Sequence, residues 1–125
     1  MFARTQQDLG QLKSRVTFMQ HDFFQPQPVQ DASVYLFRQV LHNWSDDDCV
    51  RILKAVVPAL EKCRPHTPLL INDTIIPATG TRSRSEEHGT RQIDMLMLVA
   101  LGAKQRSEAE FKELLQRADE RFHVS

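Results

Sequence analysis

Three side chains able to hold or transfer a proton stand at the ends of short apolar runs. Asp22 and His42 each follow such a run, and Asp73 ends a third one. Histidine can act as a general base near neutral pH, and a carboxylate beside the imidazole can orient it. If the runs are parallel strands, their carboxyl ends share one edge of a sheet, where α/β folds bind ligands, so these side chains would converge. The alternatives are a loop histidine without chemistry and aspartates that only form turns.

The strands and helices that would position these residues alternate along the chain. Apolar runs predict strands at residues 16–19, 33–40 and 69–76, the second of them covered on both faces. Apolar residues at helical spacing predict amphipathic helices at about 46–62 and 107–118. Such alternation is typical of βαβ units, so we expect one α/β domain over the whole chain, with parallel strands flanked by helices.

Local signals mark where the two helices begin. Ser45 with Asp48 and Ser107 with Glu110 have the spacing of capping boxes. Pro58 lies within the first helix, where we expect a kink or a break. The residues expected to face the core are Cys49, Ile52, Leu53, Val56, Val57 and Leu60 in the first helix and Phe111, Leu114, Leu115 and Ala118 in the second.

The composition argues against several classes of partner. The 125 residues include 16 Lys and Arg and 16 Asp and Glu, so the zero net charge does not favour binding to nucleic acid or anionic membranes. No apolar run approaches the roughly 20 residues of a membrane span, and the N-terminus is too polar for a signal peptide. Cys49 and Cys63 fit no zinc-binding pattern, so we expect no metal and reduced thiols in a cytoplasmic protein.

The motifs also resemble those of a known enzyme family. The segments are FxxHDFF at 18–24, YLFRQVLHNWSDDDCVRIL at 35–53, LLINDTIIP at 69–77, DMLMLVALGAKQRSEAEF at 94–111 and ADERF at 118–122. In this order they resemble S-adenosylmethionine-dependent O-methyltransferases of the plant caffeate and fungal secondary-metabolite type. The resemblance implies a partial Rossmann-like class I methyltransferase domain that methylates an aromatic hydroxyl of a small phenolic or polyketide-like molecule.

The resemblance assigns catalytic roles to particular residues. His42 stands where the family has the general base that takes the phenolic proton, after which the oxygen attacks the sulfonium methyl group. Asp73 stands where an acidic residue, more often Glu, orients that base. Gln105 replaces a second family Glu, and Asn43 replaces the common Asp after the histidine. An amide can hydrogen-bond, but it supplies no charge to hold an imidazolium.

Cofactor contacts carry over to four positions. The resemblance implies that Asp22 and Phe23 lie around the adenine, that Trp44 stacks near the adenosine, and that Arg38 stands where the family often has Lys. Each has a purely structural alternative. Trp44 would then cap the core, Arg38 would be a solvated charge at a strand end, and Asp22 would be a turn residue.

The resemblance also implies that the apolar residues 92–101 form part of the acceptor pocket. Met95, Leu96 and Met97 resemble the family's acceptor-pocket helix, which we expect to be buried or to face a cavity. The alternative is that these adaptable side chains pack in the core.

Several parts of the family's site have no counterpart in this sequence. The four glycines form no glycine-rich cofactor loop. The first two strands, the acidic residue that grips the ribose, the helical domain of the homodimeric family and the final hairpin are also lacking. We therefore expect a fragment whose activity depends on further sequence. The alternative is a catalytically inactive remnant or interaction module of the same fold.

Overall fold

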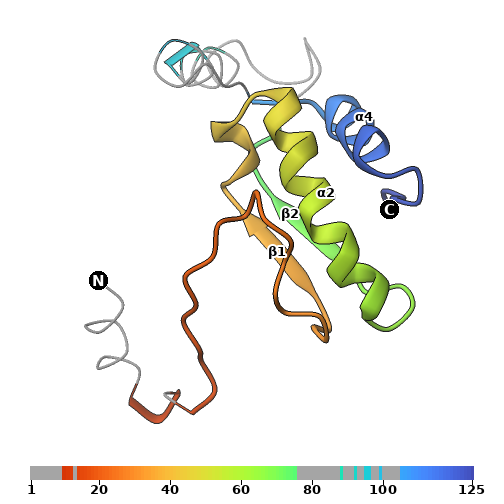
Figure 1. Ribbon diagram of the computed structural model, residues 1–125. Helices are drawn as coiled ribbons and strands as arrows, with labels where there is room; N and C mark the ends of the chain where they lie inside the picture. Colours follow the sequence, from red (N-terminus) through yellow and green to blue (C-terminus); the bar gives the residue numbers. More distant parts are fainter. Residues whose placement is uncertain are drawn as a thin grey trace.

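The computed structural model describes residues 10–12, 14–75 and 105–125, together with positions 88, 92, 95, 96 and 99. Its elements are, in order, η1 (Gly10–Leu12), β1 (Tyr35–Arg38), η2 (Leu41–Asn43), α2 (Asp46–Lys62), β2 (Leu69–Asn72) and α4 (Glu108–Ala118). Figure 1 shows α2 crossing the two strands, with α4 beside it. No described helix has the length and apolar character needed to cross a membrane.

The sheet consists of β1 and β2, which run parallel and are connected through α2. Tyr35 pairs with Leu69, and Arg38 pairs with Asn72 at the other end of the ladder. The predicted βαβ arrangement is therefore confirmed, although both strands are shorter than predicted. Gln39 ends β1 because its φ of 53° lies in the left-handed region, which does not continue a strand.

The predicted strand at 16–19 is wrong. The chain there is extended without strand pairing, and Val16 and Met19 are exposed. A strand needs a hydrogen-bonded neighbour, whereas β1 and β2 pair with each other in the described part of the chain. Figure 1 shows this N-terminal segment running away from the sheet.

In the part of the chain that the structure describes, one face of the sheet is covered and the other is not. Phe37, Leu69 and Ile71 pack against the core formed with α2 and α4. On the opposite face, Leu36 and Leu70 are neighbours in register and are 59% and 51% exposed. The prediction that residues 33–40 are covered on both faces is therefore wrong, because both helices lie on the same side of the strands.

Helix α2 begins as predicted and is continuous through its proline. The Ser45 side chain accepts a hydrogen bond from the Asp48 amide at 3.2 Å. The expected break at Pro58 does not occur. Pro58 and Lys54, the residue whose carbonyl loses its helical donor there, both lie on the exposed side of the helix, where water can compensate.

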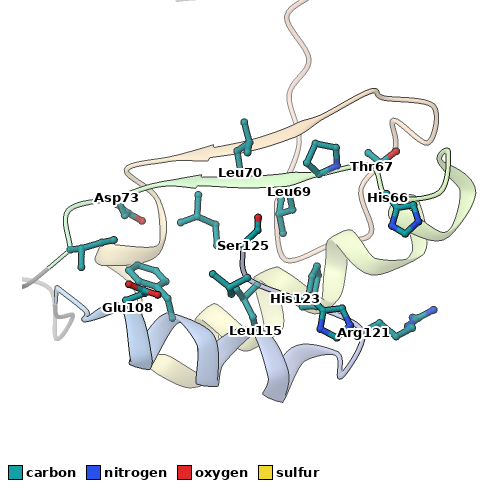
Figure 2. Close-up of a pocket in the computed structure, with 16 residues that line it drawn as sticks. His66, Thr67, Leu69, Leu70, Asp73, Glu108, Leu115, Arg121, His123 and Ser125 are labelled. Carbon is teal, nitrogen blue, oxygen red and sulfur yellow. The ribbon is translucent and has the colours of Figure 1, made fainter.

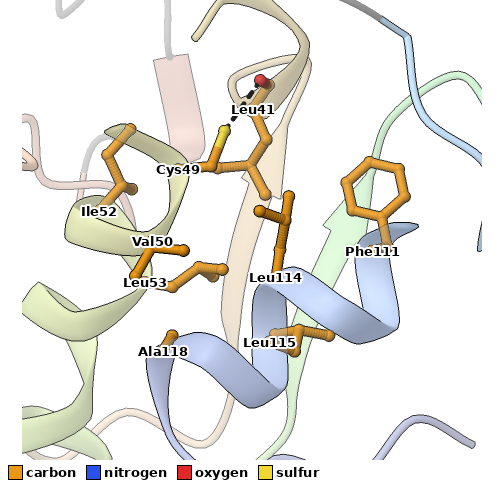
Figure 3. Close-up of a cluster of buried hydrophobic side chains, with 9 residues drawn as sticks. All are labelled: Leu41, Cys49, Val50, Ile52, Leu53, Phe111, Leu114, Leu115 and Ala118. Carbon is orange, nitrogen blue, oxygen red and sulfur yellow. Dashed lines mark hydrogen bonds between the residues drawn. The ribbon is translucent and has the colours of Figure 1, made fainter. Parts of the chain in front are cut away.

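Helix α4 begins with the predicted capping box. The Ser107 side chain accepts from the Glu110 amide, and the Glu110 carboxylate accepts from the Ser107 amide at 2.8 Å. The four apolar residues predicted for its inner face are all buried. Figure 3 shows the resulting core, which joins α2, α4 and the segment after β1; its buried members are Leu41, Cys49, Val50, Ile52, Leu53, Phe111, Leu114, Leu115 and Ala118.

Candidate active site

His42 and Asp73 meet at the carboxyl ends of the two strands. The Nδ1 atom of His42 lies 2.5 Å from one carboxylate oxygen of Asp73. The Asp73 side chain is 1% exposed and the His42 side chain 17% exposed. An ionised carboxylate can only accept hydrogen bonds, so in the neutral form of the imidazole this contact favours the proton on Nδ1 and leaves Nε2 with a lone pair.

Asp73 also holds the backbone that carries His42. Its second carboxylate oxygen accepts a hydrogen bond from the Leu41 amide at 3.2 Å. The Leu41 side chain is completely buried in the core. His42 therefore projects from η2, a single turn fixed on one side by a buried leucine and on the other by a buried carboxylate.

The turn that leads into η2 is held by backbone and side-chain contacts. The amide of Gln39 donates to the carbonyl of Asn72 at 2.9 Å, which ties this turn to the end of β2. The Asn43 side chain donates to the Gln39 carbonyl at 3.4 Å. Asn43, which replaces an acidic residue in the resemblance, thus stabilises the loop that bears His42.

Arg106 contributes to this region, although no sequence pattern points to it. Its side chain is 1% exposed. It donates to the carbonyls of Leu41 and Trp44, both at 2.8 Å, and to the Asp46 carboxylate at 2.9 Å. A buried arginine has the same sequence signature as a surface one, so only the three-dimensional contacts reveal it.

Cys49 lies beneath η2 and donates from its thiol to the Leu41 carbonyl at 3.2 Å. The residue is completely buried, and this burial raises the pKa of the Cys49 thiol to about 11. Cys63 is half-buried, and neither cysteine forms a disulfide. Both thiols are free in the structure, and their reduced state in the cell stays a prediction.

Three aromatic rings gather beside the His42 turn. Trp44 makes edge-on contacts with Phe23 and Phe24, at centroid distances of 5.7 Å and 4.9 Å. The guanidinium of Arg51 lies over the Phe24 ring at 4.8 Å. All three rings are partly buried against the core, so Trp44 has the packing role of the structural alternative. The stacking role near an adenosine stays a prediction.

Asp22 does not join the other two proton-handling residues. It is exposed, and its side chain accepts a hydrogen bond from the Phe24 amide at 3.0 Å, as a turn residue does. No hydrogen bond or ion pair links Asp22 to His42 or Asp73 in the described structure. Without a strand at 16–19, nothing brings its side chain to the sheet edge.

The remaining predicted site residues lie in different environments. Arg38 is exposed at the end of β1, and Gln105 is buried immediately before Arg106. Leu96 is helical and 63% exposed, so of the two expectations for that helix, burial or a cavity-facing position, burial does not hold here. Met97 lies outside the described residues. Their roles in catalysis, cofactor binding or acceptor binding stay predictions.

An open pocket of about 790 Å³ lies between β2 and α4. Figure 2 shows Asp73 and Glu108 near one end of it and His66 and Arg121 near the other. Neither His42 nor Asp22 lines this pocket. The predicted convergence is thus met only in part, because His42 and Asp73 are in contact whereas the Asp22 side chain accepts from the Phe24 amide instead.

The described residues contain no group of three or more His, Cys, Asp or Glu side chains that could hold a metal ion.

Comparison with known proteins places the chain in a family. The profile of the O-methyltransferase domain matches residues 2–120. O-methyltransferase sol2 of Alternaria solani is 50% identical over 117 residues, which are 94% of this chain and 27% of that protein. The chain thus spans about a quarter of the length of the curated relatives it matches.

Solved structures agree with this assignment. The mitomycin 7-O-methyltransferase MmcR superposes with a TM-score of 0.74 at 36% identity, over 93% of this chain and 31% of the other. LepI, solved in complex with SAM, gives a TM-score of 0.69 at 29% identity, over 88% of this chain and 28% of the other. The parallel strands joined by α2 are thus part of a class I methyltransferase fold. The chain belongs to the O-methyltransferase domain family.

Proposed function

We propose that this chain carries the general-base half of an S-adenosylmethionine-dependent O-methyltransferase site, with His42 as the base and an aromatic hydroxyl as the acceptor. The observation that carries the proposal is the contact between His42 Nδ1 and the buried carboxylate of Asp73 at 2.5 Å. A histidine oriented by a buried carboxylate is the arrangement expected of a general base.

The chemistry follows from the orientation of the ring. The ring proton of His42 is on Nδ1 and is directed at Asp73. The Nε2 atom can therefore accept the proton of the phenolic hydroxyl. The negative charge of Asp73 then stabilises the imidazolium that forms. A phenol has a pKa near that of tyrosine, about 10, so its proton is within reach of an imidazole, unlike that of an aliphatic alcohol.

We place the adenine end of S-adenosylmethionine beside the aromatic cluster. The rings of Trp44 and Phe23 would give a flat base apolar surface, and the exposed Asp22 carboxylate would accept a hydrogen bond from its amino group. When bound, the cofactor supplies an electrophilic sulfonium methyl group. The aromatic residues would orient the adenosine, and His42 would hold the proton released by the acceptor.

The names of relatives support a small-molecule oxygen acceptor. MmcR is a mitomycin 7-O-methyltransferase, and a relative from Aspergillus flavus is a demethylsterigmatocystin 6-O-methyltransferase, 39% identical over 103 residues. Both names describe methylation of an oxygen on a small molecule. We extend this acceptor class to the present chain on the basis of the His42 and Asp73 pair.

The second candidate is a non-catalytic remnant or interaction module of the same fold. One observation favours it. The sheet leaves Leu36 and Leu70 exposed in the described structure, which is typical of a surface that another segment or protein covers.

Calorimetric titration of the 125-residue chain with S-adenosylmethionine separates the two candidates. Binding, followed by methyl transfer to simple phenols that is lost in His42→Ala, supports the enzyme. His123→Ala is the matched control, because His123 is exposed and lies on a different part of the molecule from His42. Absence of binding at millimolar cofactor supports the remnant, and unchanged turnover in His42→Ala removes His42 from the mechanism.

A further inference from the structure

Arg106 is the largest of the fully buried side chains. A buried guanidinium is costly unless its donors are matched by acceptors, so its position is strongly specified by what surrounds it. It lies just before α4, yet it reaches the segment between β1 and α2, some 60 residues earlier in the chain. This long-range contact therefore ties the start of α4 to the turn that carries His42.

The acceptors of Arg106 lie on both sides of His42. Its Nη1 donates to the carbonyl of Leu41, which precedes the histidine, and its Nη2 donates to the carbonyl of Trp44, two residues after it. Both bonds are 2.8 Å long. The two carbonyls bracket the short segment that carries the imidazole, so the planar fork of the guanidinium fixes the ends of that segment relative to each other.

The same turn is held from the other side by Asp73. Its carboxylate binds the Leu41 amide and the His42 ring, while Arg106 binds the Leu41 carbonyl. The backbone of Leu41 is therefore held at both its N–H and its carbonyl, which belong to the two successive peptide groups on either side of its Cα. Small displacements of this turn would change the direction in which Nε2 of His42 points.

We infer that Arg106 is a positioning residue for the His42 imidazole, acting through the two bracketing carbonyls. The inference rests on the proposed function for the catalytic role of His42. The effect of Arg106 on the orientation of the His42 ring can nevertheless be measured without turnover. The rival explanation is that Arg106 only docks α4 onto α2 through Asp46. Arg117 and Asp47 make such a docking pair at 2.8 Å on the protein surface.

Two controls separate these explanations. Asp46→Asn removes the ion pair of Arg106 but leaves its two carbonyl contacts possible. Arg117→Met removes another charged contact that joins α4 to α2 and does not involve the His42 turn. If Arg106 acts as a positioning residue, neither change alters the environment of His42, whereas Arg106→Met does.

The measurements are the ¹⁵N shifts of the His42 ring, which report its tautomer, and the amide exchange rates of Asn43 and Trp44. In Arg106→Met we expect loss of the Nδ1–H tautomer signature and at least about tenfold faster exchange at both amides, since one lost hydrogen bond corresponds to about that factor. Arg106→Lys should restore part of each effect, because an ammonium cannot reproduce the fork.

The inference is overturned if a folded Arg106→Met keeps the parent ring shifts and exchange rates, or if Asp46→Asn alters them equally. If Arg106→Met does not fold, Arg106→Lys decides, and unchanged His42 shifts in that variant overturn it. A failure of His42→Ala to reduce methyl transfer would contradict the proposed function instead. The ring and exchange data would then still report whether Arg106 holds the turn.

Discussion

His42 Nδ1 and a carboxylate oxygen of Asp73 lie 2.5 Å apart, although 31 residues separate them in sequence. The register of the sheet explains this meeting. Arg38 and Asn72 are the last pair of the ladder, so Asp73 begins the path out of β2 beside the turn that leaves β1. Parallel pairing thus brings an acid and a base to one edge without any local sequence signal joining them.

Asp73→Asn tests the role of this carboxylate. The side chain of Asn has a single oxygen, which can accept from the backbone N–H of Leu41 or from the His42 ring, but not from both as Asp73 does. The other contact is lost, or the NH₂ group of Asn faces a second donor there. We expect the free energy of unfolding to fall by about 1–3 kcal/mol, measured in urea, and the His42 ring to lose its Nδ1–H preference in ¹⁵N spectra. A variant with parent stability and parent ring shifts would contradict the assigned geometry.

Local sequence signals correctly predict the features that neighbouring residues determine, such as helix caps and the buried face of a helix. Ser45 and Ser107 cap α2 and α4 as predicted, and the apolar stripe of α4 is buried. The order of strands and helices predicts that His42 and Asp73 lie at one edge of the sheet, and the family resemblance assigns Asp73 to the orientation of the His42 ring. These inferences succeed because they depend on backbone geometry over a few residues or on a general rule of parallel sheets.

Features that depend on distant partners were not predictable in the same way. Residues 16–19 have strand-forming side chains but no strand to pair with in the described structure. Leu36 looked like a buried strand residue because periodicity cannot tell which face of a sheet is covered. Arg106 became identifiable only through its contacts with Leu41, Trp44 and Asp46.

Leu53→Ala and Leu36→Ala form a matched pair that tests which face of the sheet carries the core. Leu53 is completely buried between α2 and α4, whereas Leu36 is 59% exposed. We expect Leu53→Ala to lower the free energy of unfolding by about 2–5 kcal/mol, since it removes buried methyl groups and leaves a cavity. Leu36→Ala should change it by less than about 0.5 kcal/mol. Comparable losses in urea titrations would mean that the outer face is also packed.

Ser107→Ala tests the start of α4, and with it the segment that carries Arg106. The substitution removes the acceptor for the Glu110 amide and the hydroxyl that donates to the Glu110 carboxylate at 3.0 Å. A lost cap of this kind costs about 1 kcal/mol of stability. Ser107→Thr keeps a hydroxyl at this position and should retain most of that contribution in the same thermal or urea measurement. Equal stability of the Ala variant and the parent would show that the capping box contributes nothing to the fold.

We expect alkaline pH to lower the free energy of unfolding, because the fold keeps the Cys49 thiol and the Tyr35 hydroxyl protonated. Burial raises the pKa of Cys49 from its ordinary 9.0 to about 11, and burial together with the Cys63 contact raises the pKa of Tyr35 from 10.0 to about 12. Above pH 9 the unfolded chain releases protons that the folded chain retains. The contribution of these groups is therefore complete below about pH 9 and is lost as the pH rises toward 12.

Cys49→Ala is expected to reduce this pH dependence. For Cys49 the shift corresponds to at most about 3 kcal/mol of stability lost across the alkaline range. The variant should be somewhat less stable at pH 8, because the thiol's hydrogen bond to the Leu41 carbonyl is lost, but its stability should fall less steeply between pH 9 and 11. Tyr35→Phe should flatten the remaining slope at higher pH. Urea unfolding at each pH measures both slopes, and a Cys49→Ala slope identical to the parent's would mean that the buried thiol does not resist ionisation in the folded state.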